Sequence, residues 1–228
     1  MQSEGALRQK IIDLCLEMNR SGLNQGTSGN ISARFGESML LTPSATPYDR
    51  MTPEMIARMP LDGEDGTWFG PLKPSTEWRF HRDILRARPD AGAVVHAHPI
   101  FATTIAITRR PIPACHYMVA AFGGNDVRCC GYARYGTAEL SALVVEALAD
   151  RHACLMANHG MVALGGDLDQ AMWRAVELET LARQYYHSLQ IEGGPVILSD
   201  AEIAEVGKGF ASYGRQSEPS ALAPGVSG

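Results

Sequence analysis

Several features are missing from this chain of 228 residues, and each absence excludes a class of protein. No apolar stretch approaches the roughly 20 residues that a membrane-spanning helix needs, and the N-terminus lacks the pattern of a signal peptide. We therefore expect no membrane association and predict a cytoplasmic location. Basic residues form no cluster and the formal net charge is −5, which argues against nucleic acid as a partner and favours a small substrate.

The cysteines are few and lack the spacing of a disulfide framework, a zinc knuckle or a Cys-x-x-Cys motif. We expect the five of them to be free thiols in a reducing compartment. A hydrophobic content of 45% allows one sizeable core, so a single domain over residues 1–216 is the simplest organisation. The segment 217–228 is rich in Ser, Pro, Gly and Ala and is predicted to be a flexible tail.

Helix and strand signals alternate along the chain, which is typical of an α/β layer protein. An amphipathic pattern from Leu7 to Met18 predicts a first helix that stops at Gly22. The other predicted helices cover 78–88, 137–149 and 168–189, with a surface turn at 61–66. Strands are predicted at 31–35 and 39–42 and near residues 94, 128 and 155.

Three histidines lie at the ends of apolar runs. His96 and His98 close the run 93–98, and side chains two residues apart on a strand leave it on the same face. His159 follows the apolar run 153–158 and precedes Gly160, while Asn158 before it tolerates unusual backbone angles. Two strand ends therefore converge on one point, where α/β sheets usually hold ligands.

A carboxylate completes a set that can bind a metal ion. Glu77 follows Ser75 and Thr76 at a predicted helix start, where exposed N–H groups favour anions. Three imidazoles and one carboxylate, from His96, His98, His159 and Glu77, form a zinc site capable of chemistry. Taken alone, a His-x-His pair is weak evidence, because buried histidines often serve only as hydrogen-bonding groups in a core.

Three of the four other histidines have less specific surroundings, and the fourth, His116, precedes Tyr117 in a block described below. His81 and His187 fall on helix-like stretches and His152 falls in a polar turn. We interpret these three as structural or solvated side chains.

Seven sequence blocks occur in order along nearly the whole chain. They are GLNQGTSGNIS at 22–32, LTPS at 41–44, PSTEWRFH at 74–81, VVHAH at 94–98, HYM at 116–118, YARYGT at 132–137 and NHG at 158–160. With these blocks the chain resembles the class II aldolase/epimerase family, most closely its branch of L-fuculose-1-phosphate aldolases. The resemblance implies a three-layer αβα fold on a central, mainly antiparallel sheet, assembled as a C4 homotetramer with active sites at subunit interfaces.

The resemblance also implies a reaction and a cofactor. The implied enzyme is a zinc-dependent aldehyde-lyase that reversibly cleaves a ketose 1-phosphate into dihydroxyacetone phosphate and an aldehyde. Its substrate would be L-fuculose 1-phosphate or a related 5-deoxypentulose or methylthioribulose 1-phosphate. Mn²⁺ or Co²⁺ would be alternatives to zinc as the metal ion. In the family, the glutamate that matches Glu77 both ligates the resting metal and acts as the catalytic acid and base.

Further site residues are implied by the same resemblance. Tyr117 matches a tyrosine that reaches across a subunit boundary to the aldehyde oxygen, and Tyr213 matches one in a C-terminal segment that closes over the site. Tyr135 stands where the family presents an aromatic wall to the aldehyde. The implied phosphate-binding residues are Thr27, Gly29, Asn30, Ser44, Ala45, Ser75 and Thr76. Ala45 replaces the usual glycine and Ser44 the common threonine, so the phosphate could lie in a slightly shifted position.

Three alternatives share the fold. The branch similar to L-ribulose-5-phosphate 4-epimerase has aspartate at the position of Glu77, so the glutamate favours cleavage over epimerisation. A dehydratase acting on methylthioribulose 1-phosphate usually differs at the same motif. A binding module similar to the adducin head has lost the metal residues, which are all present here.

Overall fold

A seven-stranded sheet forms the centre of the computed structural model, which describes residues 3–210. The strand order is β3-β2-β1-β4-β7-β6-β5. The strands are β1 (Asn30–Phe35), β2 (Ser38–Leu41), β3 (Ala57–Pro60), β4 (Ala93–Ala97), β5 (Cys129–Cys130), β6 (Ala153–Met156) and β7 (Gly160–Gly165). Every neighbouring pair is antiparallel except β5 with β6, so the expected mainly antiparallel sheet is confirmed.

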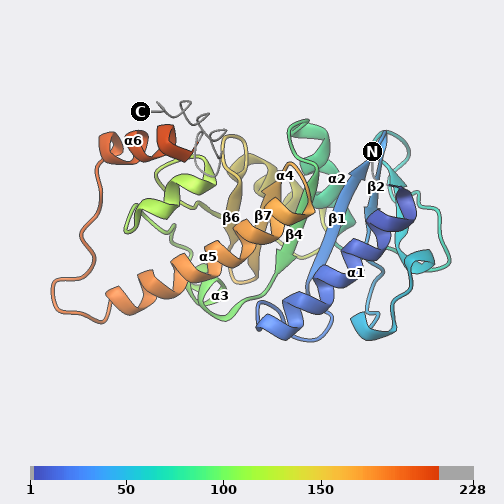
Figure 1. Ribbon diagram of the computed structural model, residues 1–228, viewed down its shortest axis with the longest axis horizontal. Coiled ribbons are helices and arrows are strands. Elements are labelled where there is room, and N and C mark those ends of the chain that lie inside the picture. Colours follow the sequence, from blue (N-terminus) through green and yellow to red (C-terminus); the bar gives the residue numbers. More distant parts are fainter. Residues whose placement is uncertain (1–2, 211–228) are drawn as a thin grey trace, which may run out of the picture.

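Helices cover both faces of this sheet and make three layers (Figure 1). One face carries α1 (Glu4–Ser21), α3 (Ile100–Ile107) and α5 (Leu168–Ser188), and α6 (Asp200–Phe210) packs there against the 3₁₀ helix η3 (Tyr117–Phe122). The opposite face carries α2 (Trp78–Ala87) and α4 (Ala138–Ala147). Two further 3₁₀ helices, η1 (Tyr48–Arg50) and η2 (Pro53–Met55), lie between β2 and β3 in the chain. The predicted αβα architecture is confirmed.

The alternation of side chains along the central strands assigns residues to the two faces. In β4, Val95 packs in the core under α1, α3 and α5, whereas Val94 packs in the core under α2 and α4. His96 lies two residues after Val94 and therefore points to the α2 side. In the neighbouring β1, Ile31 belongs to the first core, so Asn30 and Ser32 also point to the α2 side.

Most predicted elements have the expected type and place. α1 ends where expected, with Gly22 in the left-handed region at φ 77°. Two helices and two strands, α3, α6, β3 and β7, were not predicted. β7 was hidden because residues 153–165 form an almost continuous apolar run, which the structure folds back on itself through the turn at 157–159.

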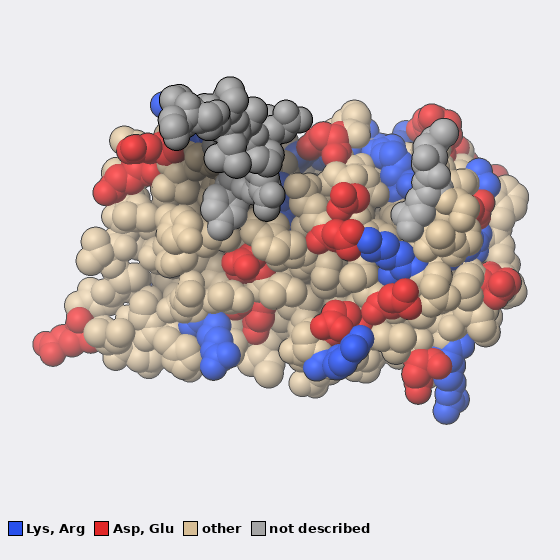
Figure 2. Space-filling view, in the orientation of Figure 1, with Lys and Arg blue, Asp and Glu red and all other residues tan. Residues whose placement is uncertain are grey.

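Charged side chains lie mostly on the outside and mix both signs. Figure 2 shows basic and acidic side chains interspersed over α1, and several of them are paired, as in Arg8–Glu4 and Arg20–Glu17. Within residues 3–210, none of the helices combines the length and apolar character that crossing a membrane would require. Tyr213 and the predicted tail at 217–228 lie outside the described residues.

Candidate metal centre and active site

Three histidine rings meet where β4 ends beside the turn that precedes β7. β4 and β7 pair antiparallel, with Ala97 opposite Met161, so the turn that carries His159 lies next to the end of β4. Nitrogen atoms of His96, His98 and His159 all lie within 4.8 Å of one another. The structure thus brings together the three histidines that the sequence singled out.

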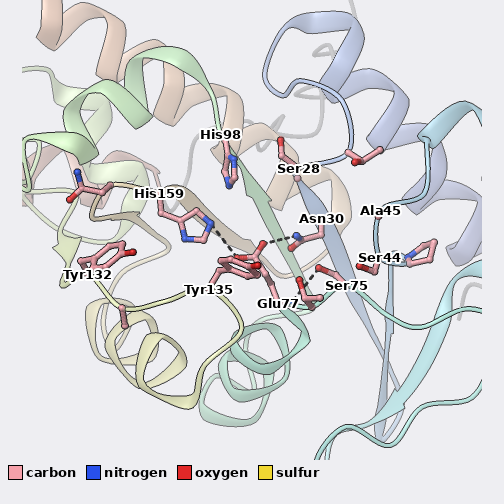
Figure 3. A pocket seen from close by; sticks show the side chains of 16 residues that line it. Ser28, Asn30, Ser44, Ala45, Ser75, Glu77, His98, Tyr132, Tyr135 and His159 are labelled. Atoms are coloured by element: carbon pink, nitrogen blue, oxygen red, sulfur yellow. Dashed lines mark hydrogen bonds and ion pairs between the residues drawn. The ribbon is translucent and has the colours of Figure 1, made fainter.

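Glu77 joins this cluster from the N-cap position, directly before α2. Its side chain is only 7% exposed. Its Oε2 lies 3.2 Å from Nε2 of His96 and accepts a hydrogen bond of 2.9 Å from the amide of Asn30. Its Oε1 lies 3.2 Å from Nε2 of His159 but accepts no well-aligned hydrogen bond, although it is buried (Figure 3). A buried carboxylate oxygen without a donor normally has an ion or a solvent molecule as its partner.

Hydrogen bonding determines which nitrogen of His96 faces the cluster. Nδ1 donates to the carbonyl oxygen of Met161 at 2.8 Å, because a carbonyl can only accept. The other nitrogen, Nε2, is therefore left with a lone pair in the neutral ring. It faces Oε2 of Glu77 and lies 3.0 Å from Nε2 of His98. Lone pairs that converge in this way repel one another unless a proton or a cation lies between them.

The direction of each pKa shift reflects the same arrangement. Burial alone would lower the pKa of His96, but the Glu77 carboxylate and the Met161 carbonyl raise it above its ordinary value. Burial would raise the pKa of Glu77, but the rings of His96 and His159 lower it well below its usual range. Burial and the neighbouring rings lower the pKa of His98 to about 3, which keeps it neutral. The cluster therefore holds an ionised carboxylate and a neutral His98, and the raised pKa of His96 indicates that the site favours positive charge.

These residues fit a divalent metal ion. Three imidazole nitrogens and a carboxylate oxygen are a ligand set that zinc uses in proteins, and the hydrogen bond from His96 to a backbone carbonyl orients the ring as metal ligands require. The buried Oε1 of Glu77, which has no hydrogen-bond donor, is the second observation that supports the fit.

The cluster opens into a pocket of about 440 Å³. One end of the pocket is lined by Glu77, His98 and His159. The rest is lined by hydroxyl, amide and backbone groups from three loops, and by two tyrosine side chains. These residues are Thr27, Ser28, Gly29, Asn30, Pro43, Ser44, Ala45, Ser75, Thr76, Tyr132, Ala133, Tyr135 and Asn158. All seven residues expected to bind phosphate thus lie on the same pocket as the histidine cluster (Figure 3).

Close packing holds the Gly-rich loop against the end of β4. A Cβ atom at Gly29 would lie 2.9 Å from the carbonyl oxygen of His96, so only glycine allows this approach. The hydroxyl of Tyr48 donates to the carbonyl of Gly29 at 2.6 Å, and Ser28 donates to the side chain of Asn24. The loop therefore presents its polar groups to the pocket from a well-anchored backbone.

Ala45, which also lines the pocket, has a backbone conformation that favours glycine. Its φ of 51° lies in the left-handed region, where a Cβ atom is unfavourable. The chain therefore keeps a glycine-like conformation at the position where alanine replaces the usual glycine. Asn158 is similar, with φ 54°, as expected for a residue that tolerates such angles beside His159.

The predicted tyrosines are divided between different places. Tyr135 is 63% exposed and lines the pocket, as does Tyr132, which the sequence analysis did not single out. The pair of tyrosines at 132 and 135, in one loop, was the feature of the sequence from which Tyr132 could have been predicted to line the pocket. Tyr117 lies in η3, is 50% exposed and is not part of the pocket wall within this chain. Tyr213 lies outside the described residues.

Comparison with known proteins connects this geometry to a family. Residues 9–186 match the family described as Class II Aldolase and Adducin N-terminal domain. The chain is 48% identical over 212 residues to the L-fuculose phosphate aldolase of Escherichia coli O6:H1, covering 93% of this chain and 97% of the relative. It is 50% identical over 209 residues to the 5-methylthioribulose-1-phosphate/5-deoxyribulose-1-phosphate aldolase of Rhodospirillum rubrum, covering 92% of this chain and 93% of the relative.

A solved structure of an L-fuculose 1-phosphate aldolase has the same fold. It superimposes with a TM-score of 0.86 and 34% sequence identity, covering 92% of this chain and all of that chain. The similarity therefore extends over the sheet, both helical layers and the loops that carry the pocket.

Proposed function

This chain belongs to the class II aldolase family, and we propose that it reversibly cleaves a ketose 1-phosphate into dihydroxyacetone phosphate and an aldehyde. The observation that carries the proposal is one pocket that joins a histidine and carboxylate cluster to hydroxyl-rich loops. The relatives named for L-fuculose phosphate and for 5-methylthioribulose or 5-deoxyribulose 1-phosphate are almost equally similar to it. The substrate class is accordingly a ketose 1-phosphate with a short or deoxygenated far end.

In the proposed reaction His96, His98 and His159 hold a divalent metal ion, and Glu77 is its fourth ligand in the resting site. We propose zinc, with Mn²⁺ or Co²⁺ as alternatives, because neutral imidazole ligands suit these metals. The bound cation supplies positive charge that stabilises the negative charge developing on substrate oxygens as the carbon–carbon bond breaks. The neutrality of His98 and the orientation of His96 support this assignment.

The phosphate is proposed to bind without lysine. Hydroxyl groups of Thr27, Ser44, Ser75 and Thr76 line the pocket, and Asn30, whose amide bonds to Glu77, lines it beside the histidine cluster. Hydroxyls and backbone N–H groups bind phosphate well where the loops that carry them are fixed in place. The backbones of Gly29 and Ala45 border the same region and complete the proposed phosphate site.

Proton transfer is assigned to Glu77 and Tyr117. Cleavage removes a proton from the hydroxyl that becomes the aldehyde, and it returns a proton to the carbon of the three-carbon fragment. Glu77 is ionised at rest, so it takes up the proton released from the hydroxyl and delivers it to that carbon through Oε1, the oxygen that no hydrogen-bond donor occupies. Tyr117, exposed on η3 and absent from this chain's own pocket, serves the aldehyde oxygen in the pocket of another copy, and Tyr213 is proposed to act with it.

The assembly that follows is a homotetramer with active sites between subunits. The exposed side chain of Tyr117 and the exposed apolar residues Ile100, Trp173 and Val176 support contacts with other copies. We propose that residues 1–216 form one domain. The five cysteines, all within the described residues, form no disulfide, which supports a reducing compartment such as the cytoplasm.

The first experiment measures release of dihydroxyacetone phosphate from a panel of ketose 1-phosphates, with and without a chelator. The panel contains L-fuculose, 5-deoxyribulose and 5-methylthioribulose 1-phosphates, and an isomer assay on L-ribulose 5-phosphate runs beside it. We expect release that the chelator abolishes and that added zinc restores. Epimerisation without release would move the function to the epimerase branch, and neither activity in a metal-free protein would favour a binding module.

A further inference from the structure

A chain of buried polar side chains runs from Glu77 into the interior between α2 and β1. Asn30 and Ser32 lie two residues apart on β1, so both side chains leave the strand toward α2. His81 follows Glu77 by one turn of α2, which places the two on the same side of the helix. The ring of His81 is completely buried and stacks on Phe80 with a centroid distance of 4.6 Å.

Each neighbouring pair in this chain is within hydrogen-bond distance. The amide Nδ2 of Asn30 is 2.9 Å from Oε2 of Glu77. Nε2 of His81 is 2.5 Å from Oδ1 of Asn30, and Nδ1 of His81 is 2.7 Å from Oγ of Ser32. Since these groups are buried, each one is held by its partner in the chain and not by bulk solvent.

The charge of Glu77 fixes the donor-to-acceptor direction of this series of hydrogen bonds. An ionised carboxylate only accepts, so Asn30 has to present its NH₂ group to Glu77 and its oxygen to His81. Nε2 of His81 therefore carries the ring proton and donates to Asn30. Burial lowers the pKa of His81 to about 3, so the neutral ring has a single proton and its Nδ1 accepts from the hydroxyl of Ser32.

The reverse orientation would break two contacts together. If the amide of Asn30 were flipped, its oxygen would face the Glu77 carboxylate and its NH₂ group would face the N–H of His81. Both contacts would join groups of like polarity in a buried site, where such mismatches are most costly. The Nε2–H of His81 thus supports the orientation of the Asn30 amide that the Glu77 carboxylate requires.

We propose that His81 is a positioning residue that, through Asn30, holds one oxygen of Glu77 and leaves the other for the substrate proton. The inference rests on the proposed function in so far as Glu77 transfers that proton. Oε2 is held by Asn30, whereas Oε1 has no aligned donor, and this division between the two oxygens is what the chain maintains. The sequence alone suggested only a structural or solvated histidine at this position.

The kinetic test compares two substitutions of His81 with a control. His81→Leu removes the donor to Asn30, whereas His81→Gln keeps an amide N–H able to reach it. His152→Leu is the control, because His152 is half-buried and bonds to Arg88 outside the site. For each purified full-length variant, kcat, KM, bound metal and melting temperature are measured.

We expect His81→Leu to lower kcat about 10- to 100-fold while the bound metal per chain stays unchanged, as for residues that orient metal-site ligands. His81→Gln should recover kcat to within about threefold of the wild type if the donor is what matters. A wild-type kcat in His81→Leu would overturn the proposal. Equal losses in both variants would overturn it too, because packing of the ring would then be the cause.

A second measurement requires neither catalysis nor metal. Long-range ¹H–¹⁵N NMR of the metal-free wild-type protein reports which ring nitrogen of His81 carries the proton, and His81→Gln assigns the signal by its loss. The proposal requires the proton on Nε2, and a proton on Nδ1 would overturn it. If the wild type cleaves no ketose 1-phosphate, the proposed function fails, but this measurement still decides whether His81 donates its hydrogen bond to Asn30.

Discussion

Replacing Glu77 with glutamine exchanges one oxygen of the cluster for an NH₂ group and tests both proposed roles of this residue. Glutamine can keep an oxygen for the amide of Asn30, whose donor lies 2.9 Å from Oε2. Its NH₂ group then occupies the place of Oε1, 3.2 Å from Nε2 of His159. An amide at that place is neither basic nor acidic enough to transfer a proton. The three histidines remain, so the metal site loses one ligand of four.

The expected loss in turnover follows from the missing proton transfer. General acid and base catalysis by one side chain contributes about 10²- to 10⁴-fold. At 1.36 kcal/mol for each factor of ten, this corresponds to about 3–5 kcal/mol of activation free energy. We therefore expect kcat of Glu77→Gln to fall by about 10²- to 10⁴-fold. Bound metal per chain should be retained, although with weaker affinity.

The assay measures release of dihydroxyacetone phosphate at saturating substrate and metal, with elemental analysis of the same preparation. Glu139→Gln, at an exposed position in the first turn of α4, is the matched control and should keep wild-type turnover. A Glu77→Gln variant with kcat within about fivefold of the wild type would refute the acid and base assignment. A variant without metal would show instead that the carboxylate is needed mainly as a ligand.

The remaining predictions concern ligand loss, backbone fit and helix capping. His96→Ala should lose both bound metal and turnover, and full metal content by elemental analysis would contradict its role as a ligand. Gly160→Ala would place a methyl group 2.6 Å from both the carbonyl oxygen of Ala97 and the ring of His98, so bound metal and melting temperature should fall, whereas Gly207→Ala, with open space around it, should do neither. Ala45→Gly should be neutral or raise the free energy of unfolding by up to about 1 kcal/mol, since relief of the left-handed backbone exceeds the added entropy of the unfolded chain; a clear loss in urea denaturation would contradict this. Thr137→Ala removes the hydroxyl that accepts from Leu140 N–H and should cost about 1 kcal/mol in the same assay, with no change in metal content.

Local patterns in the sequence were sufficient for the elements that carry the metal ligands. The apolar run before His96 predicts a buried strand, and a period of two residues places His96 and His98 on one side of it. The glycine after the first helix and the polar residues at helix starts predict where α1, α4 and α5 begin or end. These features depend on residues close together in the chain, so no tertiary information is needed to recognise them.

The tertiary structure decided which of these residues meet. β4 and β7 pair in the sheet only because the chain turns back at 157–159, and that pairing brings His159 beside His98. The same packing turns Asn30 and Ser32 toward α2, where His81 completes a chain of hydrogen bonds to Glu77. The sequence by itself determined the chemical groups and the strand face of each, whereas their hydrogen-bond partners depend on contacts between distant segments, which only the folded core brings together.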